Sequence, residues 1–133
     1  MRAKIVEGFR IMNEHEGQLT KRFLEGIKNI PSLKLYGNSD PKSTFEGKRT
    51  PTFAMRMNCF KTAGELAEAL VDRKIVTAAS HFYAKYFSEG LDLDKTGGYV
   101  RIGFAHYNTF DEIDKVLEAL KEIEGQVPNG CNL

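Results

Sequence analysis

One apolar stripe runs through the first thirty residues of the chain. Its members recur every three or four residues, as one face of a helix requires, and the spacing is interrupted only at Glu16. They are Ile5, Phe9, Met12, Leu19, Phe23, Ile27 and Ile30. Pro31 follows directly, and a proline pushes the residue before it out of the helical region. The stripe therefore predicts a long N-terminal helix over residues 2–29.

Two short segments alternate between apolar and other side chains, as half-buried strands do. Residues 52–57 place Phe53, Met55 and Met57 on one face, and residues 99–105 place Val100, Ile102 and Phe104 on one face. Further strands are predicted at residues 32–36 and 75–79. Within the segment 99–105, the alternation turns Arg101 away from the apolar face.

Two capping boxes mark the starts of further helices. Thr62 with Glu65, and Thr109 with Glu112, place an acidic side chain three residues after a threonine cap. They predict helices over residues 62–73 and 109–123. The aromatic segment 81–88 predicts a helix or a turn. Residues 38–51 contain two prolines and several small polar residues, so they predict an ordered loop or lid.

This order of helices and strands predicts a two-layer α/β sandwich, in which an open mixed sheet carries packed helices. The connection through helix 62–73 is long enough for strands 52–57 and 75–79 to form a parallel pair. A chain of 133 residues has the length of one domain, so residues 1–133 are expected to form a single domain.

Charge and composition argue against several classes of partner. The 19 basic residues nearly balance the 18 acidic ones, which gives no electrostatic case for binding nucleic acid or an anionic membrane. No apolar run approaches the roughly 18 residues of a transmembrane helix, and the N-terminus lacks the pattern of a signal peptide. Two cysteines are too few for a secreted disulfide framework. A cytoplasmic location is therefore expected.

Motifs that carry chemistry on their own are absent from the sequence. It contains no GxGxxG, GxxxxGK[ST], HExxH or GxSxG, and its three histidines have no metal-ligand spacing. No catalytic residue and no metal site are predicted. Arg101 is the exception to this generic pattern, because a planar guanidinium near Gly98 and Gly103 suits bidentate capture of a carboxylate. Considered alone, the residue pattern still favours an ordinary surface arginine.

Several segments taken together resemble the C-terminal small domain of class V PLP-dependent aminotransferases, in particular the cysteine desulfurase and selenocysteine lyase-like enzymes. The most specific are Tyr99-Val100-Arg101-Ile102-Gly103, His106-Tyr107-Asn108-Thr109 and Glu112-Ile113-Asp114. The resemblance also includes Arg49-Thr50-Pro51-Thr52-Phe53, Lys74-Ile75-Val76 and Ser80-His81-Phe82-Tyr83-Ala84. It covers nearly the whole chain, and it implies an α+β fold with a small, largely antiparallel sheet covered by helices.

The resemblance implies roles for a few residues. Arg101 matches the arginine that binds the α-carboxylate of the substrate. Ser80, His81, Phe82, Tyr83 and Asn108 are expected to line the pocket, with loop 38–50 as a lid. Tyr83 stands where desulfurases carry a catalytic cysteine, and without a thiolate no persulfide forms there. This departure favours a lyase, aminotransferase or epimerase.

In this family the PLP lysine and the phosphate donors lie in a large domain that precedes the small one. The resemblance therefore implies PLP in the parent enzyme, no PLP bound to this chain alone, and an inactive isolated chain. The large PLP-binding domain of the same enzyme is the expected partner, docked on an apolar patch of the first helix and the aromatics 82–87. A homo-oligomer is also expected. The alternative is a stand-alone ligand-binding or protein-interaction module that kept the fold without catalysis.

Overall fold

The protein, described by a computed structural model over residues 1–126, is an α+β fold with one four-stranded sheet. Its elements in chain order are α1 (Arg2–Ile27), β1 (Leu33–Tyr36), β2 (Thr52–Met57), α2 (Ala63–Val71), β3 (Ala78–Ser80), α3 (Lys85–Gly90), the 3-10 helix η1 (Asp94–Thr96), β4 (Tyr99–Gly103) and α4 (Phe110–Gln126). The predicted fold class is confirmed, as is the order of the main helices and strands.

The sheet has the order β1-β2-β4-β3, and every neighbouring pair is antiparallel. The predicted parallel pairing of strands 52–57 and 75–79 is wrong, because β4 lies between β2 and β3. These two strands do run in the same direction, as the long connection through α2 requires. However, β4 has the more continuous apolar face and takes the central position, while β3 is left as a three-residue edge strand.

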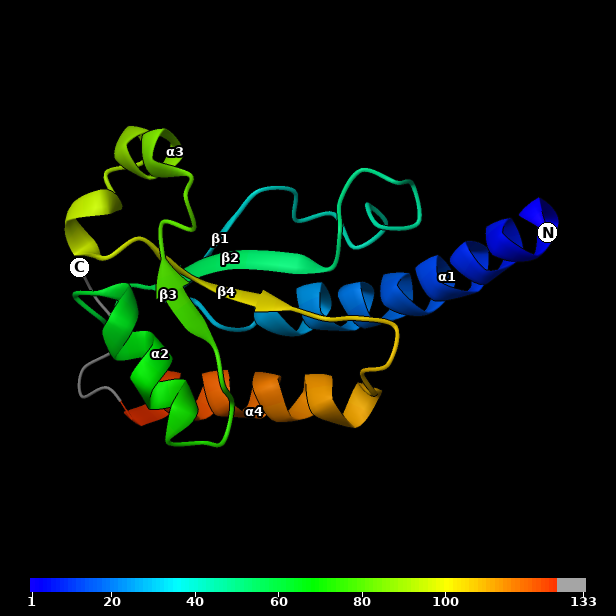
Figure 1. Ribbon diagram of the computed structural model, residues 1–133. Helices are drawn as coiled ribbons and strands as arrows, with labels where there is room; N and C mark the ends of the chain where they lie inside the picture. The colour runs from blue at the N-terminus through cyan, green and yellow to red at the C-terminus, as the bar shows by residue number, and fades with distance from the viewer. Residues whose placement is uncertain (127–133) are drawn as a thin grey trace.

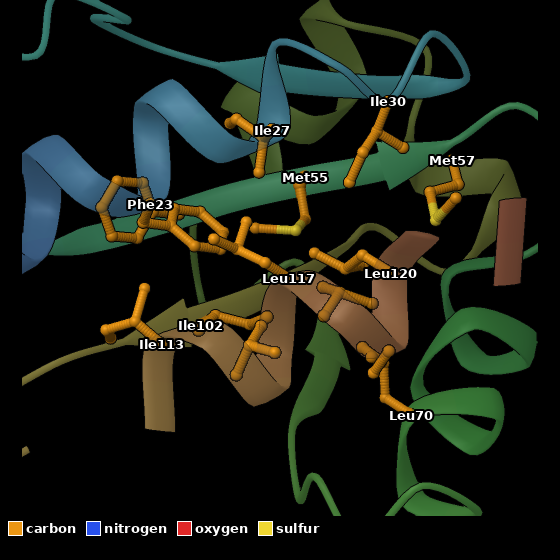
Figure 2. Packing of buried hydrophobic residues seen from close by; sticks show 14 of the residues in the cluster. Phe23, Ile27, Ile30, Met55, Met57, Leu70, Ile102, Ile113, Leu117 and Leu120 are labelled. Carbon is orange, nitrogen blue, oxygen red and sulfur yellow. The ribbon is translucent and has the colours of Figure 1, made fainter. Parts of the chain in front are cut away.

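One face of the sheet is covered by the C-terminal half of α1 together with α2 and α4, as Figure 1 shows. The side chains between these layers form one apolar core (Figure 2), which includes the fully buried Phe23, Phe53, Met55, Leu66, Leu70, Val100, Ile113 and Leu120. A bidentate ion pair from Arg22 to Asp114, at 2.6 and 2.7 Å, joins α1 to α4 at the surface.

Both predicted capping boxes are confirmed. The Glu65 amide donates to the Thr62 hydroxyl at 3.2 Å, and the Glu65 carboxylate accepts from the Thr62 amide at 3.1 Å. Thr109 and Glu112 make the same reciprocal pair at 3.3 and 2.8 Å. Because these bonds satisfy N–H groups that have no partner within the helix, they fix where α2 and α4 begin.

The first helix extends beyond the body of the molecule. Figure 1 shows that the N-terminal half of α1 projects away from the sheet. The apolar stripe continues into this half, where Ile5, Val6, Phe9 and Ile11 are all more than half exposed. Among the helices within residues 1–126, none has the length and apolarity needed to cross a bilayer.

The strand predicted at residues 75–79 is found later and is shorter, as β3 at Ala78–Ser80. The aromatic segment 81–88 is a turn followed by α3, because Phe82 and Tyr83 adopt left-handed backbone angles that interrupt a helix. Loop 38–51 packs against the middle of α1, where a Cβ added to Gly17 would meet the Phe45 ring at 2.4 Å. Arg49 closes the base of this loop by donating to the Thr52 carbonyl at 2.7 Å. The lid role of the loop stays a prediction.

Candidate functional site

Arg101 occupies the middle of the sheet face that the three core helices leave open. The strand register places Tyr36, Ala54, Arg101 and Ala78 in one row across all four strands. Alanines on both sides leave space around the Arg101 side chain, which is exposed. Within residues 1–126 no hydrogen-bond or ion-pair partner meets its guanidinium, so the N–H groups of Arg101 are available to a ligand.

The Arg101 guanidinium lies over an aromatic ring. The guanidinium carbon lies 4.0 Å from the centre of the Phe82 ring. Phe82 in turn packs on the buried Tyr99 with ring centres 5.3 Å apart, and Phe87 meets the other side of this cluster at 6.1 Å from Tyr99. The predicted pocket residue Phe82 is therefore in direct contact with the predicted carboxylate ligand Arg101.

The loop that carries Phe82 has an unusual backbone. Phe82 and Tyr83 have φ angles of 48° and 63°, in the left-handed region that favours glycine. Such a conformation costs on the order of 1–2 kcal/mol for each residue. Hydrogen bonds hold it, because the Phe82 amide donates to the Ser80 hydroxyl at 3.3 Å and the Tyr83 amide donates to His81 Nδ1 at 3.1 Å. Tyr83 is left fully exposed at the tip.

Gly98 packs against the backbone of this loop at Ser80 and His81. A Cβ added to Gly98 would lie 2.3 Å from the Ser80 carbonyl oxygen and 2.7 Å from the His81 nitrogen, and its φ angle is 79°. Only glycine allows this close approach of two backbones. The Gly98 carbonyl also accepts a hydrogen bond from the Arg56 guanidinium at 2.9 Å. Arg56 thus fixes the turn against which residues 80 and 81 rest.

A cavity of about 430 Å³ adjoins Arg101 at the edge of the sheet, and Asn108, Lys74, Lys115 and Glu112 also line it. The structure therefore brings the predicted residues Arg101 and Asn108 to one cavity. Asn108 is held by its neighbours, since its Oδ1 accepts from the Ala105 amide at 2.8 Å and its Nδ2 donates to Glu112 at 3.1 Å. Hydrogen bonds, first from the Thr109 backbone and then from Asn108, lower the pKa of Glu112.

Ser80, His81, Phe82 and Tyr83 do not line this cavity. Their loop meets Arg101 through the Phe82 ring instead. Reasoning from the sequence missed Arg56 and Gly98, which position the loop. The glycine doublet at 97 and 98 was a signal of a special backbone, but nothing in the sequence indicates which segment packs against it.

Comparison with known proteins assigns the family. The sequence profile described as aminotransferase class-V matches residues 4–116. The chain belongs to the class-V aminotransferase family.

Two curated relatives illustrate the range of this family. Aminotransferase-like protein FGM3 of Gibberella zeae is 31% identical over 117 residues, which are 83% of this chain and 27% of that protein. A probable cysteine desulfurase of Staphylococcus epidermidis is 28% identical over 119 residues, which are 86% of this chain and 25% of that protein.

Solved structures share the fold. The apo cysteine desulfurase of Thermococcus onnurineus NA1 matches 95% of this chain with a TM-score of 0.78 and 22% identity, and the match covers 29% of that chain. The cysteine desulfurase CsdA of Escherichia coli matches 83% of this chain with a TM-score of 0.64 and 15% identity, over 24% of that chain. The chain therefore spans less than a third of the length of each of these proteins.

Enzymes of this family depend on PLP in general. A PLP enzyme holds the cofactor as a Schiff base on a lysine that lies in a pocket with donors for the phosphate. All twelve lysines of the chain fall within residues 1–126, and every one of them is exposed. The described residues alone do not fit the cofactor.

Proposed function

We propose that the chain is the C-terminal small domain of a PLP-dependent, cysteine desulfurase-like enzyme that acts on an amino acid, and that Arg101 binds the α-carboxylate of the substrate. The observation that carries this proposal is the state of Arg101. It is an exposed cation at the centre of the open sheet face, and its N–H groups meet no acceptor within residues 1–126. A carboxylate fits the planar fork of a guanidinium with two parallel hydrogen bonds.

We further propose that the large PLP-binding domain of the same enzyme covers the open side of this domain. Most of the large exposed apolar residues lie in two groups, on the projecting half of α1 and around α3. Phe9 is 65% exposed in the first group, and Tyr86 is 90% exposed in the second. Apolar surface of this kind is typical of a docking site. Assembly into a homo-oligomer and a cytoplasmic location stay expectations.

Tyr83 bears on the type of reaction. A phenol is a weaker nucleophile than a thiolate and does not accept a sulfur atom as a persulfide. If Tyr83 occupies the place of the desulfurase cysteine, sulfur transfer through this loop is excluded. We therefore propose a lyase, aminotransferase or epimerase reaction, with a selenocysteine lyase-like enzyme among the lyases.

The test is kinetic and uses the whole protein that carries this domain. Arg101→Lys keeps the charge and loses the bidentate fork, so kcat/KM should fall while the melting temperature stays the same. A loss of about 2–5 kcal/mol corresponds to roughly 30-fold to several thousand-fold in kcat/KM. The control is Arg22→Lys, which changes a surface ion pair between α1 and α4. An unchanged kcat/KM in Arg101→Lys would refute the proposal and favour a non-catalytic binding module.

A further inference from the structure

We propose that Phe82 is a positioning residue for Arg101, whose ring holds the guanidinium plane so that the N–H edge stays open to a carboxylate. The inference rests on the proposed function, since it assumes that Arg101 binds a carboxylate. It adds a residue from the loop 80–84 to that site and assigns the residue a physical task.

A guanidinium can stack on an aromatic ring and bind a carboxylate at the same time, because the two interactions use different parts of the group. An aromatic ring attracts a cation through its face, and a guanidinium stacks face to face on it. The five N–H groups of arginine point outward in the guanidinium plane, where a carboxylate binds them. At 4.0 Å from the Phe82 ring centre, the Arg101 guanidinium carbon is at stacking distance. This distance points to Phe82 stacking on a face of the guanidinium, an arrangement that leaves the N–H edge free.

The ring that makes this contact is itself fixed. Tyr99, which is only 7% exposed, supports the Phe82 ring from the sheet at 5.3 Å between ring centres. The Phe82 amide is bound to Ser80, and the backbone of residues 80 and 81 rests on Gly98. A ring anchored at this many points does not follow the motions of Arg101, so it is Arg101 that is ordered by the contact.

The backbone of Phe82 supports the same conclusion. A bulky residue at a φ angle of 48° is an outlier, because glycine or asparagine takes this conformation at lower cost. Outliers of this kind persist where surrounding contacts hold them, and they gather at functional sites. Here the outlier directs an aromatic ring onto the one guanidinium of the sheet that has no protein acceptor within residues 1–126.

The contact should strengthen carboxylate binding by removing disorder beforehand. A free arginine side chain samples many rotamers, and a ligand must order it. Stacking of a cation on an aromatic ring stabilises the ordered state by an amount equivalent to roughly 2- to 30-fold in affinity. Replacing Phe82 by a residue without a π face should weaken carboxylate binding by a factor in this range.

The experiment uses the full 133-residue chain and acetate as the carboxylate probe, with the Arg101 Nε–Hε resonance followed by NMR. Binding is weak, so the initial slope of the shift against acetate concentration is proportional to the association constant, with the limiting shift change as the factor. The variants are Phe82→Leu, which removes the π face, and Phe82→Tyr, which keeps it. The matched control is Phe87→Leu, since Phe87 belongs to the same aromatic cluster but is in contact with Tyr99 and not with Arg101.

We expect the slope to fall roughly 2- to 30-fold in Phe82→Leu and to stay at the wild-type value in Phe82→Tyr and Phe87→Leu. Equal slopes in wild type and Phe82→Leu would overturn the inference and leave the carboxylate role of Arg101 intact. No acetate-dependent shift in the wild type would instead refute the proposed function. If Phe82→Leu does not fold, the wild-type spectrum alone decides. A ring stacked on Arg101 must shift the Arg101 side-chain protons upfield. If no Arg101 protons are found at upfield positions, the stack is contradicted.

Discussion

Two arginines on the same sheet face, Arg56 and Arg101, have opposite surroundings. Arg56 is 8% exposed, and its guanidinium donates to the carbonyls of Gly98 at 2.9 Å and Lys61 at 3.0 Å and to the Thr96 hydroxyl at 2.8 Å. Arg101, on the neighbouring strand, is exposed, and within residues 1–126 its guanidinium has no hydrogen-bond or ion-pair partner and lies over the Phe82 ring. Both terminal nitrogens of the Arg56 guanidinium donate to protein acceptors, whereas the Arg101 guanidinium meets none within residues 1–126.

The difference indicates how to separate a structural cation from a binding cation. Burying a charge is unfavourable unless hydrogen bonds replace its water. Arg56 meets this requirement with backbone carbonyls, and its bonds leave little capacity for a ligand. Arg101 keeps its water, so a ligand carboxylate has only water to displace. Unfilled hydrogen-bonding capacity, more than the presence of a charge, marks the candidate site.

Gly98 lies between the surroundings of Arg56 and the loop that contacts Arg101. Changing Gly98 should therefore have the largest effect on the free energy of unfolding. Gly98→Ala adds a Cβ only 2.3 Å from the Ser80 carbonyl oxygen at a φ angle of 79°. Left-handed strain and displacement of backbone should together destabilise the fold by about 2–5 kcal/mol. Gly97→Ala is the control, because Gly97 has a φ angle of 78° but nothing within 4 Å of its Cβ position.

The measurement is chemical denaturation of both glycine variants. Gly97→Ala should lose only the strain energy, on the order of 1–2 kcal/mol. If the two variants are equally stable, the close packing of Gly98 on the loop 80–84 is wrong. The loop would then be independent of the turn that Arg56 holds.

Replacing each of the two arginines by methionine should change the free energy of unfolding by clearly different amounts. Arg56→Met leaves the buried Gly98 carbonyl and the part-buried Lys61 carbonyl without this donor. Each unsatisfied group costs about 1–3 kcal/mol, less the desolvation cost that the removed charge no longer imposes. We expect a net loss of roughly 2–3 kcal/mol in the free energy of unfolding. Arg101→Met should change it by no more than about 1 kcal/mol, because it loses only the contact of an exposed guanidinium with Phe82. Urea denaturation at neutral pH checks both, and a destabilised Arg101→Met would mean that Arg101 has a structural role.

The smallest expected effect concerns the titration of Tyr36. It tests whether the buried surroundings of Arg56 extend to Tyr36, which lies in the row of Ala54 and Arg101. Burial raises the pKa of the Tyr36 phenol, and the nearby Arg56 charge opposes this rise. A raised pKa in the folded state means that the unfolded chain loses this proton first. The free energy of unfolding should therefore be unaffected below about pH 10 and should fall as the pH rises through the range between the unfolded and folded pKa values.

Tyr36→Phe removes this titration, so its free energy of unfolding should decline less steeply above about pH 10 than that of the wild type. Denaturation curves of both proteins between neutral and alkaline pH provide the measurement. Parallel curves would indicate that Tyr36 is solvated like Arg101, and that the buried environment ends at Arg56.

Local signals in the sequence predicted most of the fold. The helix starts after Thr62 and Thr109 followed from capping chemistry, which acts within four residues and is visible in the sequence. The alternation in residues 52–57 and 99–105 predicted which faces enter the core. The neighbours of β3 could not be predicted in this way, because strand order depends on which faces compete for the centre of the sheet, and β4 comes last along the chain.

The site shows the same limit. The direction of Arg101 followed from strand alternation, and its exposure agrees with that prediction. The contact between Phe82 and Arg101 depends on two left-handed residues, which sequence statistics assign to glycine or asparagine and not to Phe82 and Tyr83. The role of Arg56 was hidden because an arginine in an alternating strand reads as a solvent-facing residue, while its carbonyl partners come from residues 60–61 and 96–98.

The projecting half of α1 also has a mechanical consequence. The C-terminal half of α1 is attached to the core by buried Phe23 and to α4 by the Arg22–Asp114 ion pair. The helix therefore moves with the sheet as one rigid rod. From Gly17 to Arg2 this rod reaches about 22 Å at 1.5 Å per residue. A tilt of only about 10° at its base displaces the far end by roughly 4 Å. Any body attached along this lever would act on α4 through the Arg22–Asp114 ion pair and on the core through Phe23.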